Sequence, residues 1–111
     1  MPRRAYRIRK ALKYLQEGLG EALEMDRVAR EVGLSRPHFY KLFRAQVGLT
    51  PNLYLNALRM EQAIDMLATS EDGVADIGFD LGFSSQASFS RFFIGNGVVP
   101  PSAYRRSVHV A

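Results

Sequence analysis

The feature that most constrains the fold is a pattern of residues that the chain carries twice. The first copy begins at Val28 and the second at Ile77, and the two stay in register up to a serine, Ser35 or Ser84. After that serine the second copy has one extra residue. The matching residues are Val28-Ala29, Val32-Gly33-Leu34-Ser35, Phe39, Leu42-Phe43, Pro51 and Tyr54, and then Ile77-Gly78, Leu81-Gly82-Phe83-Ser84, Phe89, Phe92-Phe93, Pro101 and Tyr104. Each copy predicts a short helix, a tight turn and a second helix, which together make a helix-turn-helix.

Helical periodicity and capping residues predict an all-α chain of seven helices without strands. The expected helices cover residues 4–19, 25–32, 36–47, 51–68, 74–81 and 85–94, with a short last helix after Pro101. Ser35 and Thr50 are expected N-caps, because a proline follows each within the first helical turn. Gly95-Asn96-Gly97 is expected to end the sixth helix. The long helix over 51–68 is expected to link a first lobe, about 4–50, to a second lobe, about 70–106.

The steep crossing of two helices in a helix-turn-helix places specific demands on the sequence. A small residue is needed where the helices approach most closely, and Ala29 and Gly78 stand there. The turn needs a residue that tolerates positive φ, and Gly33 and Gly82 supply it. The crossing also needs apolar residues on both helices, which are Val28, Val32, Leu34, Phe39 and Leu42 in the first copy and Ile77, Leu81, Phe83, Phe89 and Phe92 in the second. Both copies therefore meet every demand of the motif.

The carboxylates of this chain are unevenly placed. The sequence has 111 residues and a formal net charge of +4. All 11 acidic residues fall within residues 17–31 and 61–80, and none lies within 32–60 or 81–111. The second helix of each copy is therefore free of acid, whereas a solvated surface normally mixes both signs. This distribution predicts a negatively charged partner at two surfaces.

The outward face of each second helix predicts that this partner is DNA. Arginine and lysine can bind guanine and glutamine can bind adenine, while alanine and proline can contact a thymine methyl group. The residues expected to contact bases are Arg36, Pro37, Tyr40 and Lys41 in the first copy and Ser85, Gln86, Ala87, Ser90 and Arg91 in the second. The residues expected to contact phosphates are Arg4, Arg7, Arg44, Thr50 and Arg105.

Other classes of function have no motif in this sequence. The absence of cysteine excludes disulfides and zinc–thiolate sites. The two histidines, His38 and His109, are not clustered with acids, so we expect no metal and no cofactor. No serine stands in a nucleophile elbow beside a base, so we do not expect an enzyme. The chain has no apolar run long enough to span a membrane and no signal-peptide pattern, which predicts a cytoplasmic protein without a membrane partner.

Over nearly all of residues 5–106 the chain resembles the DNA-binding domain of the AraC/XylS family of bacterial transcription regulators. The segments that carry the resemblance are Val32-Gly33-Leu34-Ser35, His38-Phe39, Gly48-Leu49-Thr50-Pro51 with Tyr54, Ile77-Gly78-Phe79-Asp80-Leu81-Gly82-Phe83-Ser84-Ser85-Gln86, Phe89-Ser90-Arg91-Phe92-Phe93 and Pro101-Ser102-Ala103-Tyr104-Arg105.

The resemblance implies a fold and a set of partners. The fold is a seven-helix domain in which two helix-turn-helix lobes are bridged by a long helix. The third and sixth helices would enter successive major grooves of double-stranded DNA, one helical turn or about 34 Å apart. The implied location is the bacterial cytoplasm, at the nucleoid, with RNA polymerase as a further partner. In many members an effector-binding or dimerisation domain precedes this domain.

The sequence departs from the family pattern in three places. Glu24 stands where Ser or Thr usually precedes the second helix, which weakens that cap. Ile94-Gly95-Asn96 replaces the usual basic end of the sixth helix and removes expected phosphate contacts. The glycine after this helix, Gly97, comes one place early, with Val98 and Pro100 where glycine and Ser or Thr are usual. We therefore expect a looser second lobe and a larger share of the DNA affinity in the third helix.

Two functions of different classes remain open. The first is a sequence-specific transcription regulator, and the second is a helix-turn-helix fold that serves as a protein-interaction module. The outward residues that favour DNA are Arg36, Lys41, Arg44, Gln86 and Arg91. Counterion release makes DNA affinity fall by about 0.9 log unit per phosphate contact for each log unit of salt, whereas a protein partner gives a flatter response.

Overall fold

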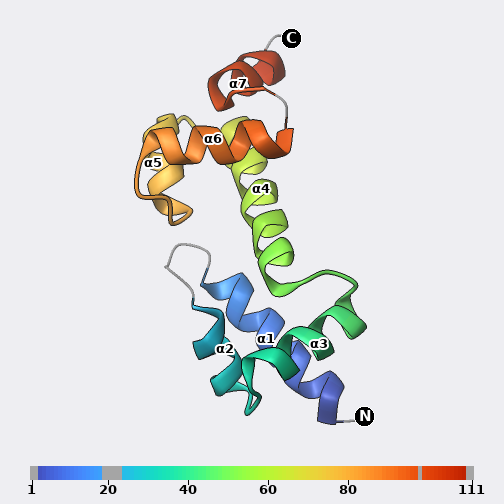
Figure 1. Ribbon diagram of the computed structural model, residues 1–111. Coiled ribbons are helices and arrows are strands. Elements are labelled where there is room, and N and C mark those ends of the chain that lie inside the picture. The colour runs from blue at the N-terminus through green and yellow to red at the C-terminus, as the bar shows by residue number, and fades with distance from the viewer. Residues whose placement is uncertain (1–2, 19–23, 98, 110–111) are drawn as a thin grey trace. The chain divides into compact units, whose positions relative to one another are not determined.

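The computed structural model describes residues 3–18, 24–97 and 99–109, with seven α-helices and no strand among them (Figure 1). The helices are α1 (Arg3–Glu17), α2 (Met25–Glu31), α3 (Arg36–Val47), α4 (Pro51–Thr69), α5 (Val74–Asp80), α6 (Gln86–Gly97) and α7 (Pro101–His109). The all-α prediction and the number of helices are confirmed. No helix of the described part is long and apolar enough to cross a membrane.

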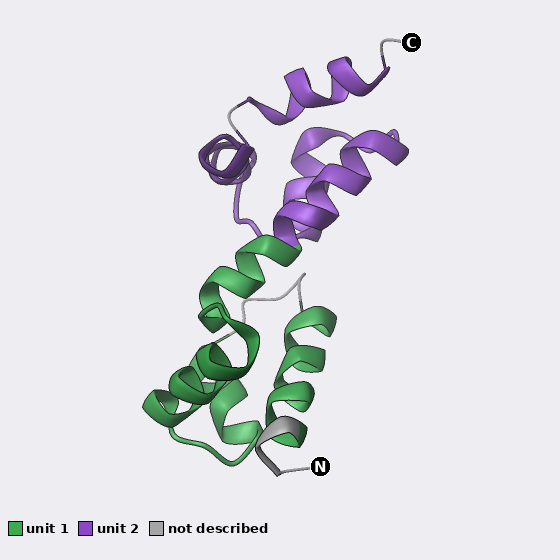
Figure 2. Ribbon diagram, turned by 90° about the vertical axis from the view of Figure 1, so that its right-hand side faces the viewer, with its two compact units in different colours: residues 1–58 green, residues 59–111 purple. Residues whose placement is uncertain are grey.

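The chain divides into two compact units, residues 1–58 and 59–111, and the boundary lies inside α4 (Figure 2). The first part of α4 contributes Leu55 to the core of unit 1, and the later part contributes Ala63 and Leu67 to the core of unit 2. Each unit therefore has its own hydrophobic core and its own pair of helices joined by a tight turn.

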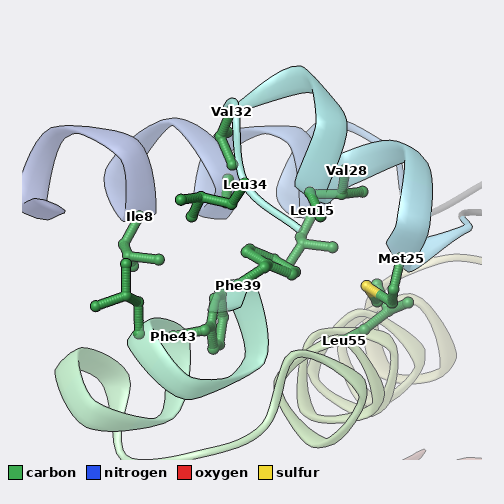
Figure 3. Close-up of a cluster of buried hydrophobic side chains, with 12 residues drawn as sticks. Ile8, Leu15, Met25, Val28, Val32, Leu34, Phe39, Phe43 and Leu55 are labelled. Carbon is green, nitrogen blue, oxygen red and sulfur yellow. The ribbon is translucent and has the colours of Figure 1, made fainter. Parts of the chain in front are cut away.

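The core of unit 1 is built from all four of its helices (Figure 3). Side chains from α1, α2, α3 and α4 point into one cluster, with Phe39 and Phe43 fully buried at its centre. The rings of these two phenylalanines lie 5.6 Å apart in an edge-on arrangement, and the Tyr54 ring lies 5.7 Å from that of Phe43. Full burial of such a side chain stabilises a fold by about 1.5–3 kcal/mol, so α3 is fixed mainly through its inward phenylalanines.

The core of unit 2 repeats this plan, again with two buried phenylalanines on its second helix. Phe89 and Phe93 of α6 are buried together with Ile77 of α5. The Phe93 ring lies 5.9 Å from that of Tyr104, which joins α7 to the cluster. The inward face of α6 is therefore set by phenylalanines at the spacing of one helical turn, as in α3.

The two turns share one hydrogen-bond pattern. Gly33 and Gly82 have φ of 75° and 92°, so both expected positive-φ positions are confirmed. After the first turn the Leu34 N–H donates to the Ala29 carbonyl at 2.9 Å. The same bond in the second turn runs from Phe83 to Gly78 at 3.0 Å. These bonds fix the path of the chain out of α2 and α5 in the same way.

The predicted positions of the small residues at the two helix crossings are also confirmed. Ala29 is buried. A Cβ added to Gly78 would lie 2.8 Å from the Phe89 Cβ, closer than two carbons can approach. The crossing of α5 and α6 therefore admits no side chain at this position.

The caps agree with the sequence for the helices of unit 1. The Ser35 hydroxyl accepts from the His38 N–H at 3.3 Å, and the Thr50 hydroxyl accepts from the Leu53 N–H at 3.2 Å. Glu24 is the N-cap of α2 but makes no side-chain capping bond, as expected from its type.

The expected end of α6 at residue 94 is wrong, because the helix continues through both glycines to Gly97. The Asn96 side-chain amide donates to the Phe92 carbonyl at 2.8 Å, which satisfies a carbonyl near the end of the helix. A Cβ on Gly97 would lie 2.7 Å from the Met60 Cε, the flexible end of a side chain of α4. The start of α6 is also one residue later than expected, at Gln86.

Candidate nucleic-acid interface

The outward face of α3 carries most of the residues expected to read DNA in unit 1. Arg36, Pro37, Lys41 and Arg44 are exposed, whereas Tyr40 is half-buried against the core. The Tyr40 hydroxyl accepts a hydrogen bond from the Asn52 side-chain amide at 3.0 Å. The structure therefore brings the predicted base-contacting residues of this helix onto one surface, with Tyr40 the most firmly held.

Arg36 is restrained by two neighbours. Its Nη1 lies 3.4 Å from Asp26 Oδ1, and its Cζ lies 5.3 Å from the centroid of the Tyr40 ring. The Tyr40 hydroxyl and then the Asp26 carboxylate raise the pKa of the Arg36 guanidinium. The sequence predicted Arg36 as a base contact and Asp26 only as an acid in the first turn of the second helix, and it gave no role to Asn52.

The outward face of α6 is arranged differently from that of α3. Gln86, Ala87 and Arg91 are exposed and Ser90 is half-buried. The Ser85 hydroxyl accepts from the Ser88 N–H at 3.0 Å and thus caps the helix. Because the second copy has one extra residue in the turn, the capping serine is Ser85 and not Ser84.

A short chain of hydroxyl contacts follows from this cap. The Ser85 hydroxyl donates to the Ser88 hydroxyl at 3.0 Å, and Arg91 Nη2 donates to that same Ser88 oxygen at 3.4 Å. The predicted base contact Ser85 is therefore occupied in fixing the start of α6, while Arg91 remains exposed beside it.

The predicted phosphate contacts fall into separate groups. Arg44 is exposed in the last turn of α3, and Arg7 is half-buried in α1. The side chain of Arg4 lies outside the described residues. Thr50 caps α4 through its oxygen, which leaves its O–H free to donate.

Arg105 is placed differently from the other predicted phosphate contacts. Its guanidinium donates to three main-chain carbonyls of unit 2, with distances of 3.1 Å to Leu67, 2.6 Å to Asp72 and 3.1 Å to Ser70. These carbonyls lie at the carboxyl end of α4 and just beyond it, where intrahelical partners run out. We therefore assign Arg105 to the structure of unit 2 and leave it out of the interface.

One cation of unit 2 received no role from the sequence. Arg59 is half-buried in α4, with its Cζ 5.6 Å from the centroid of the Phe83 ring. Burial lowers the pKa of its guanidinium, and its Nε has no hydrogen-bond partner among the described residues. The Arg59 guanidinium thus stacks on Phe83 of the second turn. The two positions are too distant in the sequence for a local pattern to indicate this contact.

The electrostatics of both second helices favour an anionic partner. Neither α3 nor α6 contains a carboxylate, and each exposes at least one arginine. Among the residues that the structure describes, no group of three or more His, Cys, Asp or Glu side chains could hold a metal ion. Two helix-turn-helix motifs, each with an exposed and acid-free second helix, define a DNA-binding domain.

Comparison with known proteins agrees with this class. A family model described as a helix-turn-helix domain matches residues 28–107. The chain belongs to the AraC/XylS-type helix-turn-helix family. Sequence-specific DNA binding in transcription regulation is the function of this class of domain.

Relatives of known name are transcription regulators. The chain is 35% identical over 103 residues to the regulatory protein PocR of Salmonella typhimurium, a match that covers 93% of this chain and 34% of PocR. It is 36% identical over 95 residues to the MmsAB operon regulatory protein of Pseudomonas aeruginosa, covering 86% and 31% of the two chains. The chain thus spans about a third of the length of these relatives.

Solved structures share the fold over most of the chain. An AraC-type transcriptional regulator from Chromobacterium violaceum superposes with a TM-score of 0.83 at 26% identity, covering 96% of this chain and 95% of that one. The DNA-binding domain of AdpA, solved in complex with a target DNA, gives a TM-score of 0.84 at 27% identity, with 90% of each chain covered.

Proposed function

We propose that this chain binds one DNA duplex at two adjacent major-groove segments, with α3 reading one segment and α6 the other. The observation that carries the proposal is the repeated turn, which presents an acid-free, outward-facing helix in each unit. Solved AdpA supports it, because a domain of this fold was captured there on its target DNA. The lobes and linker helix expected from the sequence, about 4–50, 51–68 and 70–106, remain part of this proposal.

The proposed base contacts follow from exposure and chemistry. In α3 they are Arg36, Pro37, Tyr40 and Lys41, and in α6 they are Gln86, Ala87, Ser90 and Arg91. The hydroxyl of Ser85 caps α6, so its contribution to DNA binding is to hold the reading helix in place. Phosphate contacts are proposed from Arg4, Arg7, Arg44 and Thr50.

The longer protein implied by the relatives extends the proposal. Because PocR is about three times as long as the matched region, we propose that this chain corresponds to the DNA-binding part of a regulator with an effector-binding or dimerisation domain. A relative of Escherichia coli, RhaS, is named a transcriptional activator, which supports activation with RNA polymerase as a partner. Such a protein acts at the nucleoid in the bacterial cytoplasm and is not an enzyme.

The test is selection of bound sequences from random duplex DNA at two salt concentrations. Two enriched motifs about one helical turn apart, with affinity that falls steeply with salt, are the expected result. Weak binding without enrichment and with little salt dependence would favour the protein-interaction module instead. One enriched motif alone would show that only one unit reads sequence.

The two halves of the site are expected to contribute unequally. The last turn of α3 contains Arg44, whereas the last turn of α6 contains no basic residue. Phosphate contacts supply much of the affinity for DNA, so mutation of the α3 half-site should weaken binding more than mutation of the α6 half-site. Equal losses from the two mutated half-sites would contradict this expectation.

A further inference from the structure

A connected set of side chains runs through the outward end of α3. The Arg36 guanidinium contacts the Asp26 carboxylate at 3.4 Å and lies 5.3 Å above the Tyr40 ring. The Asn52 amide donates to the Tyr40 hydroxyl at 3.0 Å. Side chains from α2, α3 and α4 are thus joined around a residue that is proposed to read a base.

Each contact removes a different freedom from Arg36. An exposed ion pair alone contributes little, and the Arg36 and Asp26 side chains are 56% and 54% exposed. Stacking on an aromatic ring adds a second restraint on the guanidinium. Tyr40 is itself fixed, because its ring meets that of Phe39 edge-on at 6.0 Å and its hydroxyl is held by Asn52.

The location of the carboxylate is the unusual part of this arrangement. The whole segment of residues 32–60 is free of acid, yet Asp26 reaches the guanidinium at the start of α3 from the first turn of α2. A carboxylate beside a DNA-reading helix repels phosphate and lowers affinity for every sequence. This loss of general affinity can be offset by a gain in specificity. A guanidinium reads a base through two hydrogen bonds only when its fork is held in a defined orientation.

We infer that Asp26 is a positioning residue: it orients Arg36 on the Tyr40 ring and thereby sets the base specificity of α3 without touching the base itself. This inference rests on the proposed function, in which α3 reads DNA bases. It predicts that removal of Asp26 relaxes discrimination while general affinity for DNA stays equal or rises.

The experiment compares four variants with the wild type on a duplex that carries the selected sequence. The variants are Asp26→Ala, Arg36→Ala, the double variant, and Glu31→Ala as a control. Glu31 is an exposed acid at the end of α2 that makes no ion pair among the described residues, so its removal changes the charge equally. Affinity is measured by fluorescence anisotropy at fixed salt for this duplex and for duplexes altered at each base pair of the α3 half-site.

The expected result is specific to one base pair. Arg36→Ala identifies the base pair that Arg36 reads, where a bidentate contact supplies about 5- to 150-fold discrimination. Asp26→Ala should lose part of that discrimination, about two- to tenfold and less than Arg36→Ala loses. Glu31→Ala should strengthen binding to all duplexes alike. The double variant should discriminate between base pairs as poorly as Arg36→Ala alone, with no further loss from Asp26→Ala.

Three results would overturn the inference. In the first, Asp26→Ala changes the affinity for all duplexes alike, as Glu31→Ala does. In the second, Asp26→Ala lowers base-pair discrimination by the same factor whether residue 36 is arginine or alanine. In the third, Arg36→Ala leaves the discrimination unchanged. If circular dichroism shows that Asp26→Ala is unfolded, Asp26→Asn replaces it in the same experiment. This variant removes the negative charge but disturbs the start of α2 less. A wild type that binds every duplex equally would refute the proposed function itself, which separates the two failures.

Discussion

Replacement of Gly78 by alanine tests the closest contact in unit 2. The added Cβ would lie 2.8 Å from the Phe89 Cβ and 3.0 and 3.1 Å from two further carbons of that side chain. Carbon atoms prefer separations of about 3.5–4.0 Å. Phe89 is fully buried, so it cannot turn toward solvent, and α5 and α6 must move apart by several tenths of an ångström.

The magnitude follows from two opposing effects on the free energy of unfolding. Overpacking a buried contact by one methyl group costs about 1–3 kcal/mol. Alanine in place of glycine inside a helix gains about 1 kcal/mol. Because three contacts are too short at once, the cost should lie toward the upper end. We expect a net loss of about 1–2 kcal/mol, or a melting temperature lower by about 5–10 °C.

Urea unfolding at constant temperature, followed by circular dichroism, measures this change. Gly95→Ala is the matched control, because Gly95 lies in α6 and its added Cβ would meet no atom within 4 Å. This control should gain about 0.5–1 kcal/mol from helix propensity alone. The two variants should therefore shift the unfolding midpoint in opposite directions.

A shift of the same sign and size for both variants would refute the reasoning. It would show that the crossing of α5 and α6 tolerates a side chain at Gly78, and that glycine there is not required for the close approach. An unchanged midpoint for Gly78→Ala would show that overpacking is cheaper than the geometry indicates.

Substitutions at three other positions test separate parts of the structure. Arg105→Ala should lower the stability of unit 2 by about 1–3 kcal/mol, because three carbonyls lose their donor. Arg105→Lys should restore little, since a lysine lacks the planar fork, and a reduced salt dependence of DNA binding would instead assign Arg105 to a phosphate. Glu24→Asp should stabilise unit 1 by about 0.5–1 kcal/mol in urea unfolding by supplying the missing cap of α2, and an unchanged midpoint would speak against it. Arg91→Ala should cost about 1–3 kcal/mol of DNA binding, mainly at one base pair, whereas uniform weakening across sequences would make Arg91 a phosphate contact.

The sequence predicted those features that depend on neighbouring residues. The glycines of the two turns and the Ser35 cap act on main-chain atoms a few positions away. The positions of Ala29 and Gly78 could be predicted because a helix-turn-helix has one fixed crossing geometry. These features place the outward faces of α3 and α6, so the main surface of the candidate site was accessible from the sequence.

Contacts between residues far apart in the sequence could not be predicted from local patterns. Arg105 looked available to a phosphate because its carbonyl partners lie more than 30 positions earlier in the chain. The pair of Asp26 and Arg36 joins two helices across a turn, and an acid in a first turn is explained equally well by the helix dipole. The end of α6 was expected too early, because glycines at positions 95 and 97 are typical of a helix end.

Gly33 and Gly78 are required for unrelated reasons, and this difference predicts how each position can change. A Cβ on Gly33 would meet no atom within 4 Å, and only its φ of 75° disfavours an L-amino acid. Asparagine, which tolerates this region of backbone, or a D-alanine introduced by chemical synthesis should therefore be accepted there. At Gly78 the obstacle is volume, so neither change of handedness nor asparagine would help. The first position is constrained by chirality and the second by size, although both are occupied by the same amino acid.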